Sequence, residues 1–295
     1  MNKKILILVV SSDTYPSKRN KLTIKNTWVA KNFENVKVMF YKSANKTELQ
    51  NDELTLKVGK STLDIGKKNI LAFEYVLKNE KFDYLFRTTT TSYVNIEKLI
   101  NFIDKSNFEK DYLYCGKIMK TNDHEGNMVQ FVSGAGILFN EKTVRKIVEN
   151  KNDIDFTLWD DVGLGALVSS LEISPTEGER YEVEGNIFKQ KIDLSQYHYR
   201  CRVDNHYGYP RFLERYVIKY LHKFIEYEKV NLIVKTFWIF IFEISKLFYI
   251  QYPFLKLANL LKKLITFLLP NTIKNYLKKR YKKIYKNIQL RYFKY

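Results

Sequence analysis

Short apolar runs alternate with longer amphipathic segments along most of the first 173 residues. The first run, Ile5–Val10, contains only Ile, Leu and Val and is predicted to be a buried strand. Further strands are predicted at residues 36–43, 82–87, 111–118 and 131–140. Helices are predicted at residues 17–33 (with Leu22, Trp28 and Val29 facing inward), 63–79, 94–106, 141–152 and, after a turn, within 154–173. Strands and helices that alternate in this way form a mainly parallel sheet covered on both faces, so the sequence predicts the α/β class.

The positive charge lies mostly at the C-terminal end of the chain. Residues 229–295 contain 15 Lys and Arg against one acid, Glu243, and so carry +14 of the formal net charge of +18. Residues 1–228 are therefore predicted to form one nearly neutral domain, and residues 229–295 a separate basic tail. The two cysteines, Cys115 and Cys201, are too few for a disulfide framework, which favours a reducing compartment.

The tail combines amphipathic helical patterns with dense positive charge. Lys235, Glu243 and Lys246 interrupt its longest apolar stretch, which argues against a membrane span. Basic amphipathic helices lie in the plane of anionic membranes, whereas lysines interleaved with tyrosines also occur in nucleic-acid binding. The long Phe, Leu and Ile faces have no role on a phosphate backbone. We therefore expect residues 230–295 to attach the protein peripherally to the cytoplasmic, inner face of the cell membrane, with no nucleic-acid partner; a helical dimer interface is a third possibility.

Two adjacent carboxylates, Asp160 and Asp161, follow Trp159 at the start of the last predicted helix. An aspartate at the N-cap satisfies free backbone N–H groups and suits the helix dipole, which is one interpretation of Asp160. Capping does not explain a second adjacent acid. A carboxylate held at a helix entrance beside an apolar strand is also a candidate general base.

Two further motifs are weaker signals on their own. The bend Ser133–Gly136 contains two glycines, which allow a close backbone approach to a ligand or simply a tight turn. Arg200 and Arg202 are two residues apart on a strand-like stretch, so they point the same way and could clamp an anion. His198 lies among aromatic residues, where a histidine is more often structural than a ligand.

Five motifs follow one another across residues 3–202 in the order and spacing of a known family. They are Arg19 with Thr23–Trp28, Ile65–Tyr75 with Lys68, Phe131–Asn140, Trp159–Gly165 and His198. Together they resemble the Fringe and β-1,3-galactosyltransferase group of inverting glycosyltransferases. This resemblance implies a GT-A fold, a nucleotide-sugar donor and single-displacement transfer of the sugar.

The same resemblance explains the run Thr88–Thr91. Tyr93-Val94-Asn95 is similar to the end of the family's acidic metal motif, which places Thr89, Thr90 and Thr91 where the family has acids. Neutral hydroxyls are poor ligands for Mg²⁺ or Mn²⁺, so we expect no metal cofactor, with Mn or Mg dependence the less favoured alternative. Either protein cations neutralise the leaving diphosphate, or the chain is a catalytically silent GT-A domain that binds a glycan or a partner protein at the membrane. The retained acid pair favours activity.

The resemblance implies transfer from a nucleotide-sugar donor, most simply a UDP-sugar, to an acceptor hydroxyl. Together with a membrane-peripheral tail, it leads us to expect a cell-surface glycan or glycolipid acceptor such as a lipopolysaccharide or capsule. Asp161 is the implied base, because it occupies the family's recurring acid position, and Asp160 is the second catalytic candidate. Predicted donor-binding residues are Ser11, Arg19, Lys25, Lys68, Arg87, Thr89, Thr91, Arg200 and Arg202. Predicted acceptor-binding residues are Gly134, Ala135, Trp159 and His198, and no metal ligand is assigned. For Lys68, a solvated helix face is an equal alternative.

Overall fold

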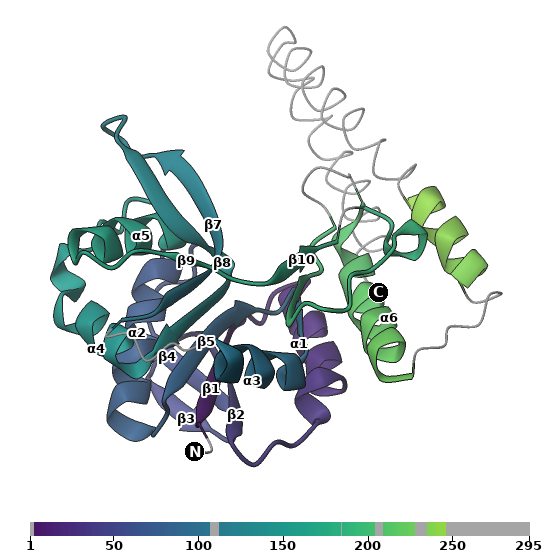
Figure 1. Ribbon diagram of the computed structural model, residues 1–295, viewed down its shortest axis with the longest axis horizontal. Coiled ribbons are helices and arrows are strands. Elements are labelled where there is room, and N and C mark those ends of the chain that lie inside the picture. The colour runs from purple at the N-terminus through teal and green to yellow at the C-terminus, as the bar shows by residue number, and fades with distance from the viewer. Residues whose placement is uncertain (1–2, 107–111, 184, 204–208, 228–234, 246–295) are drawn as a thin grey trace, which may run out of the picture. The chain divides into compact units, whose positions relative to one another are not determined.

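The computed structural model describes residues 3–106, 112–183, 185–203, 209–227 and 235–245 (Figure 1). The chain divides into two compact units, Met1–Phe242 and Glu243–Tyr295. Nearly all described residues belong to the first unit. Most of the predicted tail, 229–295, lies outside the described residues, as does the predicted boundary after residue 228.

The first unit is built on an eight-stranded sheet with the order β3-β4-β2-β1-β5-β8-β7-β9. The strands are β1 (Ile5–Val10), β2 (Val36–Ala44), β3 (Glu48–Gln50), β4 (Glu53–Lys57), β5 (Tyr84–Thr89), β7 (Tyr114–Asn122), β8 (Met128–Asn140) and β9 (Thr176–Glu177). Strands β4, β2, β1 and β5 are parallel neighbours, whereas β8 runs antiparallel to both β5 and β7. The strand predicted at 131–140 is therefore present, and it adds an antiparallel portion to the sheet.

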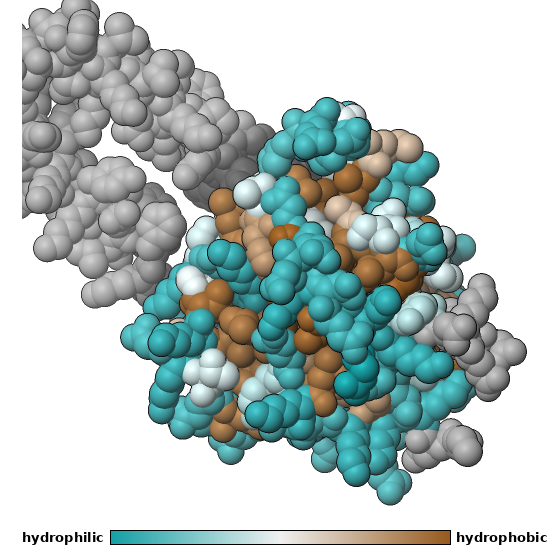
Figure 2. Space-filling view, turned by 90° about the vertical axis from the view of Figure 1, so that its left-hand side faces the viewer, coloured by the Kyte–Doolittle hydropathy of each residue, from teal (hydrophilic) through white to brown (hydrophobic). Residues whose placement is uncertain are grey.

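Helices cover both faces of this sheet (Figure 1). They are α1 (Ser17–Lys25), α2 (Ile65–Asn79), α3 (Ile96–Lys105), α4 (Glu141–Glu149), α5 (Asp160–Ser170) and α6 (Glu214–Tyr227). Alternate residues of β1 serve the two faces: Leu6 and Leu8 pack with α2, α4 and α5, and Ile5, Ile7 and Val9 pack with α1, α3 and α6. The outer surface over α2, α4 and α5 is largely hydrophilic, as expected for amphipathic helices (Figure 2). The predicted α/β class is confirmed.

The threonine run connects the central sheet to a second sheet. This small sheet has the order β10-β11-β6, with β6 at Ser92–Val94, β10 at Arg180–Glu182 and β11 at His198–Arg200. Strand β5 continues to Thr89, and after a turn at Thr90 and Thr91 the chain enters β6. The Asn95 side chain then caps α3 by accepting a hydrogen bond from the Lys98 N–H (3.1 Å).

The first predicted helix is shorter than expected and faces differently. It ends at Lys25, and a separate 3₁₀ turn, η1, spans Trp28–Ala30. Trp28 is buried as predicted, whereas Leu22 is 56% exposed and its predicted inward position is wrong. Besides Ile24, the helix buries polar residues that have partners: Asn20 donates to Glu214 (2.7 Å), and Lys21 pairs with Glu53. Apolar spacing alone could not identify a helix face that is buried through polar contacts.

Residues 235–242 belong to the first unit although the sequence assigns them to the tail. Phe242 is fully buried, and the ring of Trp238 stacks on that of Phe188 with 6.0 Å between centroids. Within the part of the chain that is described, no helix has both the length and the apolar character needed to cross a membrane.

Candidate active site

Arg87 organises the polar centre of the first unit. It lies on β5 opposite Leu8 of β1, and its side chain is 3% exposed. A buried guanidinium is costly unless its N–H groups find acceptors. Arg87 donates to the Tyr41 hydroxyl (3.2 Å), the Gly134 carbonyl, Asn69 Oδ1 (3.4 Å) and Asp160 Oδ2 (2.8 Å). These partners come from β2, β8, α2 and α5, so one arginine ties four elements together.

Asp160 is the ionic partner of Arg87. It is the first residue of α5, and its Oδ2 accepts hydrogen bonds from both Arg87 and Asn69 (3.1 Å). Trp159, and not Asp160, occupies the N-cap position, so the capping interpretation of Asp160 is replaced by an ion pair. Burial alone would lower the pKa of Arg87, but neighbouring Tyr41 and Asp160 outweigh burial and raise that pKa above its ordinary value.

Asp161 has a different environment from its neighbour. Its Oδ2 accepts the backbone N–H of Gly134 at 2.8 Å. Burial, followed by the negative charge of Asp160, raises the pKa of Asp161; the Gly134 bond and Arg87 oppose that increase. The two adjacent carboxylates therefore differ in environment. Asp160 is neutralised by its ion pair with Arg87, whereas the pKa of Asp161 is raised, which makes it the stronger base.

Two glycines allow this close arrangement. A Cβ on Gly134 would lie 2.8 Å from Arg87 NH1 and 3.2 Å from Asp161 Oδ2. A Cβ on Gly165 of α5 would lie 2.3 Å from Cβ of Phe131 and 3.0 Å from its Cα, closer than real Cβ contacts. Glycine at both positions lets α5 approach β8 closely enough for Asp161 to reach the Gly134 backbone.

Lys68 adds a positive charge to the same region. It lies in the first turns of α2 and is 5% exposed, and its ammonium group makes no hydrogen bond or ion pair with any described residue. Burial and then the charge of Arg87 lower the pKa of Lys68, while Asp64 and Asp160 oppose this shift. A buried ammonium beside an already paired Arg87–Asp160 couple is suited to a bound anion.

The hydroxyls of the threonine run mostly bind one another and the neighbouring backbone. Thr88 donates to the Ala135 carbonyl (2.7 Å), the Thr89 and Thr91 hydroxyls are 2.9 Å apart, and Thr90 donates to Ser17 (3.2 Å). Such neutral and mutually bonded oxygens do not fit Mg²⁺ or Mn²⁺, which bind charged oxygens. Among the described residues, no group of three or more His, Cys, Asp or Glu side chains is placed to hold a metal ion.

Comparison with known proteins gives only distant likenesses. No protein-family model matches the sequence, and no curated protein matches it either. A solved glycosyltransferase involved in the glycosylation of the major capsid of PBCV-1 aligns over 73% of this chain and 99% of its own, with 8% identity and a TM-score of 0.43. The glycosyltransferase GlyE of Streptococcus pneumoniae TIGR4 aligns over 79% of this chain and 62% of its own, with 11% identity and a TM-score of 0.42. The 4-diphosphocytidyl-2C-methyl-D-erythritol synthase of Anaerococcus prevotii aligns over 60% of this chain and 86% of its own, with 9% identity and a TM-score of 0.38. Similarity at this level does not establish an activity for this chain.

Three predicted donor residues lie just after β1 or on α1. Ser11 follows β1 and is buried, with its hydroxyl donating to the Tyr41 carbonyl (3.2 Å). Arg19 is half-buried on α1. Lys25 forms an ion pair with Asp52 (2.7 Å), and no described contact joins it to the aspartate pair.

The remaining predicted donor residues lie on the small sheet. Arg200 on β11 is directed at Glu182 (3.6 Å), and Arg202 is half-buried just beyond the strand. No described contact joins either arginine to Asp160 or Asp161.

The predicted acceptor residues differ sharply in exposure. Trp159 is 64% exposed immediately before the acid pair, whereas Ala135 is buried. His198 is also buried, with Nε2 3.0 Å from the Ser92 hydroxyl. Burial, and then the charges of Arg180 and Arg200, keep the pKa of His198 well below its ordinary value, so the ring is neutral. Trp159 is therefore the member of this group that the structure presents to solvent.

The sequence analysis did not single out Tyr41, Asn69 or Arg180, which the structure shows to be polar or charged residues in buried positions. Tyr41 donates a short hydrogen bond to Asn69 (2.6 Å), and both side chains accept hydrogen bonds from Arg87. Asn69 had a usable signal, because an amide within the apolar face of an amphipathic helix needs a buried partner. Arg180 lies in a polar stretch that reads as a loop, so its burial had no local signal.

Proposed function

We propose that this chain is an inverting glycosyltransferase with a GT-A-like arrangement, which moves a sugar from a nucleotide-sugar donor to a hydroxyl of a cell-surface glycan or glycolipid. The observation that carries the proposal is the division of labour between the two carboxylates, Asp161 more basic than usual and Asp160 paired with Arg87. Tyr41, one of the Arg87 partners, lies beside Val10 at the carboxyl end of β1. Ligands of open α/β sheets bind at such carboxyl ends.

The proposed chemistry is a single displacement. Asp161 takes the proton of the acceptor hydroxyl as its oxygen bonds to the anomeric carbon. The bond from that carbon to the donor phosphate breaks, and its electron pair leaves with the nucleoside diphosphate. Lys68 supplies positive charge to this leaving group, while Asp160 holds Arg87 and the start of α5 in place. The exposed ring of Trp159 offers a surface on which the acceptor sugar can pack.

We expect sugar transfer to continue in excess EDTA and to change little when Mn²⁺ is added. The reason is that Lys68, rather than a metal, would stabilise the leaving diphosphate. Lys68→Met should then lower turnover by about 10²–10³-fold, the usual cost of losing one group that stabilises developing charge. Lys67→Met is the matched control, because Lys67 is the adjacent exposed lysine. The measurement is nucleotide release from a panel of nucleotide-sugars, UDP-sugars first; EDTA-sensitive turnover that Mn²⁺ restores contradicts the proposal.

The same panel separates an enzyme from a silent binding domain. A silent domain would bind a glycan or partner protein without releasing nucleotide from any donor. The hydroxyls of the threonine run, which bind one another, are compatible with that alternative, whereas the more basic Asp161 has no use in it.

The sequence assigns membrane attachment to residues 230–295; because residues 235–242 belong to the first unit, we propose that the part beyond residue 245 attaches to anionic membrane surfaces on the cytoplasmic side. The full chain should sediment with anionic vesicles much better than with neutral ones, and salt should weaken this binding without removing it. A chain ending at residue 245 should lose the binding and remain folded, because it keeps Trp238 and Phe242 against the core. Steeply salt-dependent binding to RNA or DNA with no vesicle preference would instead indicate a nucleic-acid tail.

A further inference from the structure

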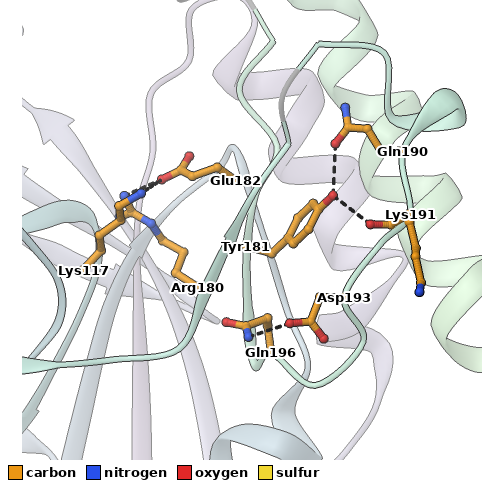
Figure 3. A pocket seen from close by; sticks show the side chains of 8 residues that line it. All are labelled: Lys117, Arg180, Tyr181, Glu182, Gln190, Lys191, Asp193 and Gln196. Atoms are coloured by element: carbon orange, nitrogen blue, oxygen red, sulfur yellow. Dashed lines mark hydrogen bonds and ion pairs between the residues drawn. The ribbon is translucent and has the colours of Figure 1, made fainter.

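A pocket lies against the small sheet, and none of its lining residues is grouped around Asp161 (Figure 3). It has a volume of about 540 Å³. Its lining residues are Lys117, Arg180, Tyr181, Glu182, Gln190, Lys191, Asp193 and Gln196. None of these belongs to β1, β2, β5 or α2, the elements that supply the proposed donor site.

Arg180 is the unusual member of this lining. Its side chain is 3% exposed, and its NH2 group pairs with Glu182. Its Nε and NH1 atoms are buried and have no hydrogen-bond partner among the described residues. Buried donors without acceptors are rare and cost stability, and they often mark the place of a ligand. Arg180 therefore has two buried donor groups that a ligand oxygen could accept from.

The charge around Arg180 is also unbalanced. Lys117 Nζ (3.9 Å) and Arg200 Nη1 (3.6 Å) approach the Glu182 carboxylate that Arg180 already binds, so three cations share this acid among the residues that the structure describes. Burial lowers the pKa of Arg180, and Glu182 does not fully offset this effect. Bringing an anion to this point would satisfy both the free donors and the excess positive charge.

Other lining groups suit a sugar. The Tyr181 hydroxyl donates to Gln190 Oε1 (3.1 Å), and Gln196 donates to Asp193 (2.9 Å) on the same wall of the pocket. Amides and hydroxyls of this kind can exchange their hydrogen bonds with sugar hydroxyls. The pocket thus combines an anion position at Arg180 and Lys117 with polar groups, both neutral and charged, that can bind sugar hydroxyls.

We propose that this pocket binds an anionic substituent, a carboxylate or a phosphate, carried by the acceptor glycan, with Arg180 and Lys117 as its anion-binding residues. The acceptor is accordingly an acidic saccharide. The assignment of the anion to the acceptor rests on the proposed glycosyl transfer, whereas the preference of the pocket for anions rests on Arg180 and the cations beside it. A donor diphosphate is the other source of an anion, and the experiment separates the two.

The test measures ligand binding to the full chain by titration calorimetry and by the shift in unfolding temperature. The probes are glucuronate, glucose, inorganic phosphate and UDP. Glucuronate and glucose differ at one carbon, which carries a carboxylate only in glucuronate. We expect wild-type protein to bind glucuronate and phosphate and to bind glucose much more weakly. Arg180→Met and Lys117→Gln should weaken glucuronate binding about 10- to 100-fold, the range for losing a charge-assisted hydrogen bond, and leave UDP binding unchanged.

The unliganded Arg180→Met chain provides a second readout. Removal of unsatisfied buried donors should leave its unfolding temperature equal to or above that of the wild type, which a purely structural arginine would not allow. If Arg180→Met fails to fold, Lys117→Gln carries the same binding test, because Lys117 is 39% exposed. Lys37→Gln is the matched control, since Lys37 also pairs with a glutamate, Glu80 (2.7 Å), but lines a different pocket.

Glucuronate and phosphate binding that survives in both variants would overturn the proposal. Loss of UDP binding in Arg180→Met would also overturn it, by assigning the anion to the donor. Glucuronate binding that depends on Arg180 in a chain that neither binds nor cleaves any nucleotide-sugar would refute the proposed function and leave the anion pocket standing.

Discussion

Asp161→Asn is expected to abolish sugar transfer and, at the same time, to stabilise the folded protein at neutral pH. Loss of a general base typically lowers the rate by about 10²–10⁴-fold. Donor binding should stay within a few-fold of wild type, because Lys68 and Arg87 are untouched. The measurements are turnover and donor affinity; near-normal turnover of Asp161→Asn, with loss in Asp160→Asn, would reverse the two roles.

The stability change follows from the raised pKa of Asp161. A carboxyl that binds its proton more readily in the folded state lowers stability as pH rises from its ordinary value of 3.8 through the higher folded value. Above that pH range the ionised Asp161 carboxylate lowers the free energy of unfolding by its full amount. An asparagine has no charge to bury, and its side-chain oxygen can still accept the Gly134 N–H. Unfolding temperatures of Asp161→Asn and wild type should therefore converge at acid pH and separate at neutral pH. The exposed Asp153→Asn serves as control and should show no such separation; a variant less stable than wild type at neutral pH contradicts this account.

Asp160→Ala should destabilise the fold by about 3–5 kcal/mol, the cost of leaving a buried charge without its partner. Arg87 would then keep only neutral acceptors in a position that is 3% exposed. Urea unfolding measures the change directly. The double variant Asp160→Ala with Arg87→Met should recover much of the loss, because no orphan charge remains.

Additive losses from the two substitutions would contradict this picture. They would mean that Arg87 and Asp160 stabilise the fold independently, and that the ion pair does not position α5. Activity should be low in every one of these variants, so stability is the measurement that distinguishes them.

The sequence was sufficient for the elements whose pattern is local. Ile5–Val10 is a strand with the predicted bounds, and α2 and α3 lie where apolar spacing placed them. The short strands β3, β9 and β10 were missed, because two or three residues carry no periodicity and their conformation depends on pairing with distant strands.

The candidate site was only partly predictable for the same reason. The acid pair and the Gly134 bend are visible as separate motifs, but their hydrogen bond joins residues 27 positions apart. The contacts of Arg87 with Tyr41 and Asn69 likewise cross between elements, and the burial of Arg180 depends on tertiary packing. Composition identifies the charged groups; only the fold decides which of them lose water and acquire partners.

Thr89 and Thr91 also restrict how such a chain can change by mutation. Their hydroxyls are 2.9 Å apart, so one Thr→Asp exchange would pair a hydroxyl with a carboxylate and bring a negative charge into a partly buried turn. A second exchange would place two carboxylates side by side and make them repel. Carboxylates at these positions are therefore expected to cost stability unless a cation binds beside them. The threonine run is therefore restricted to neutral side chains for as long as no cation occupies this turn.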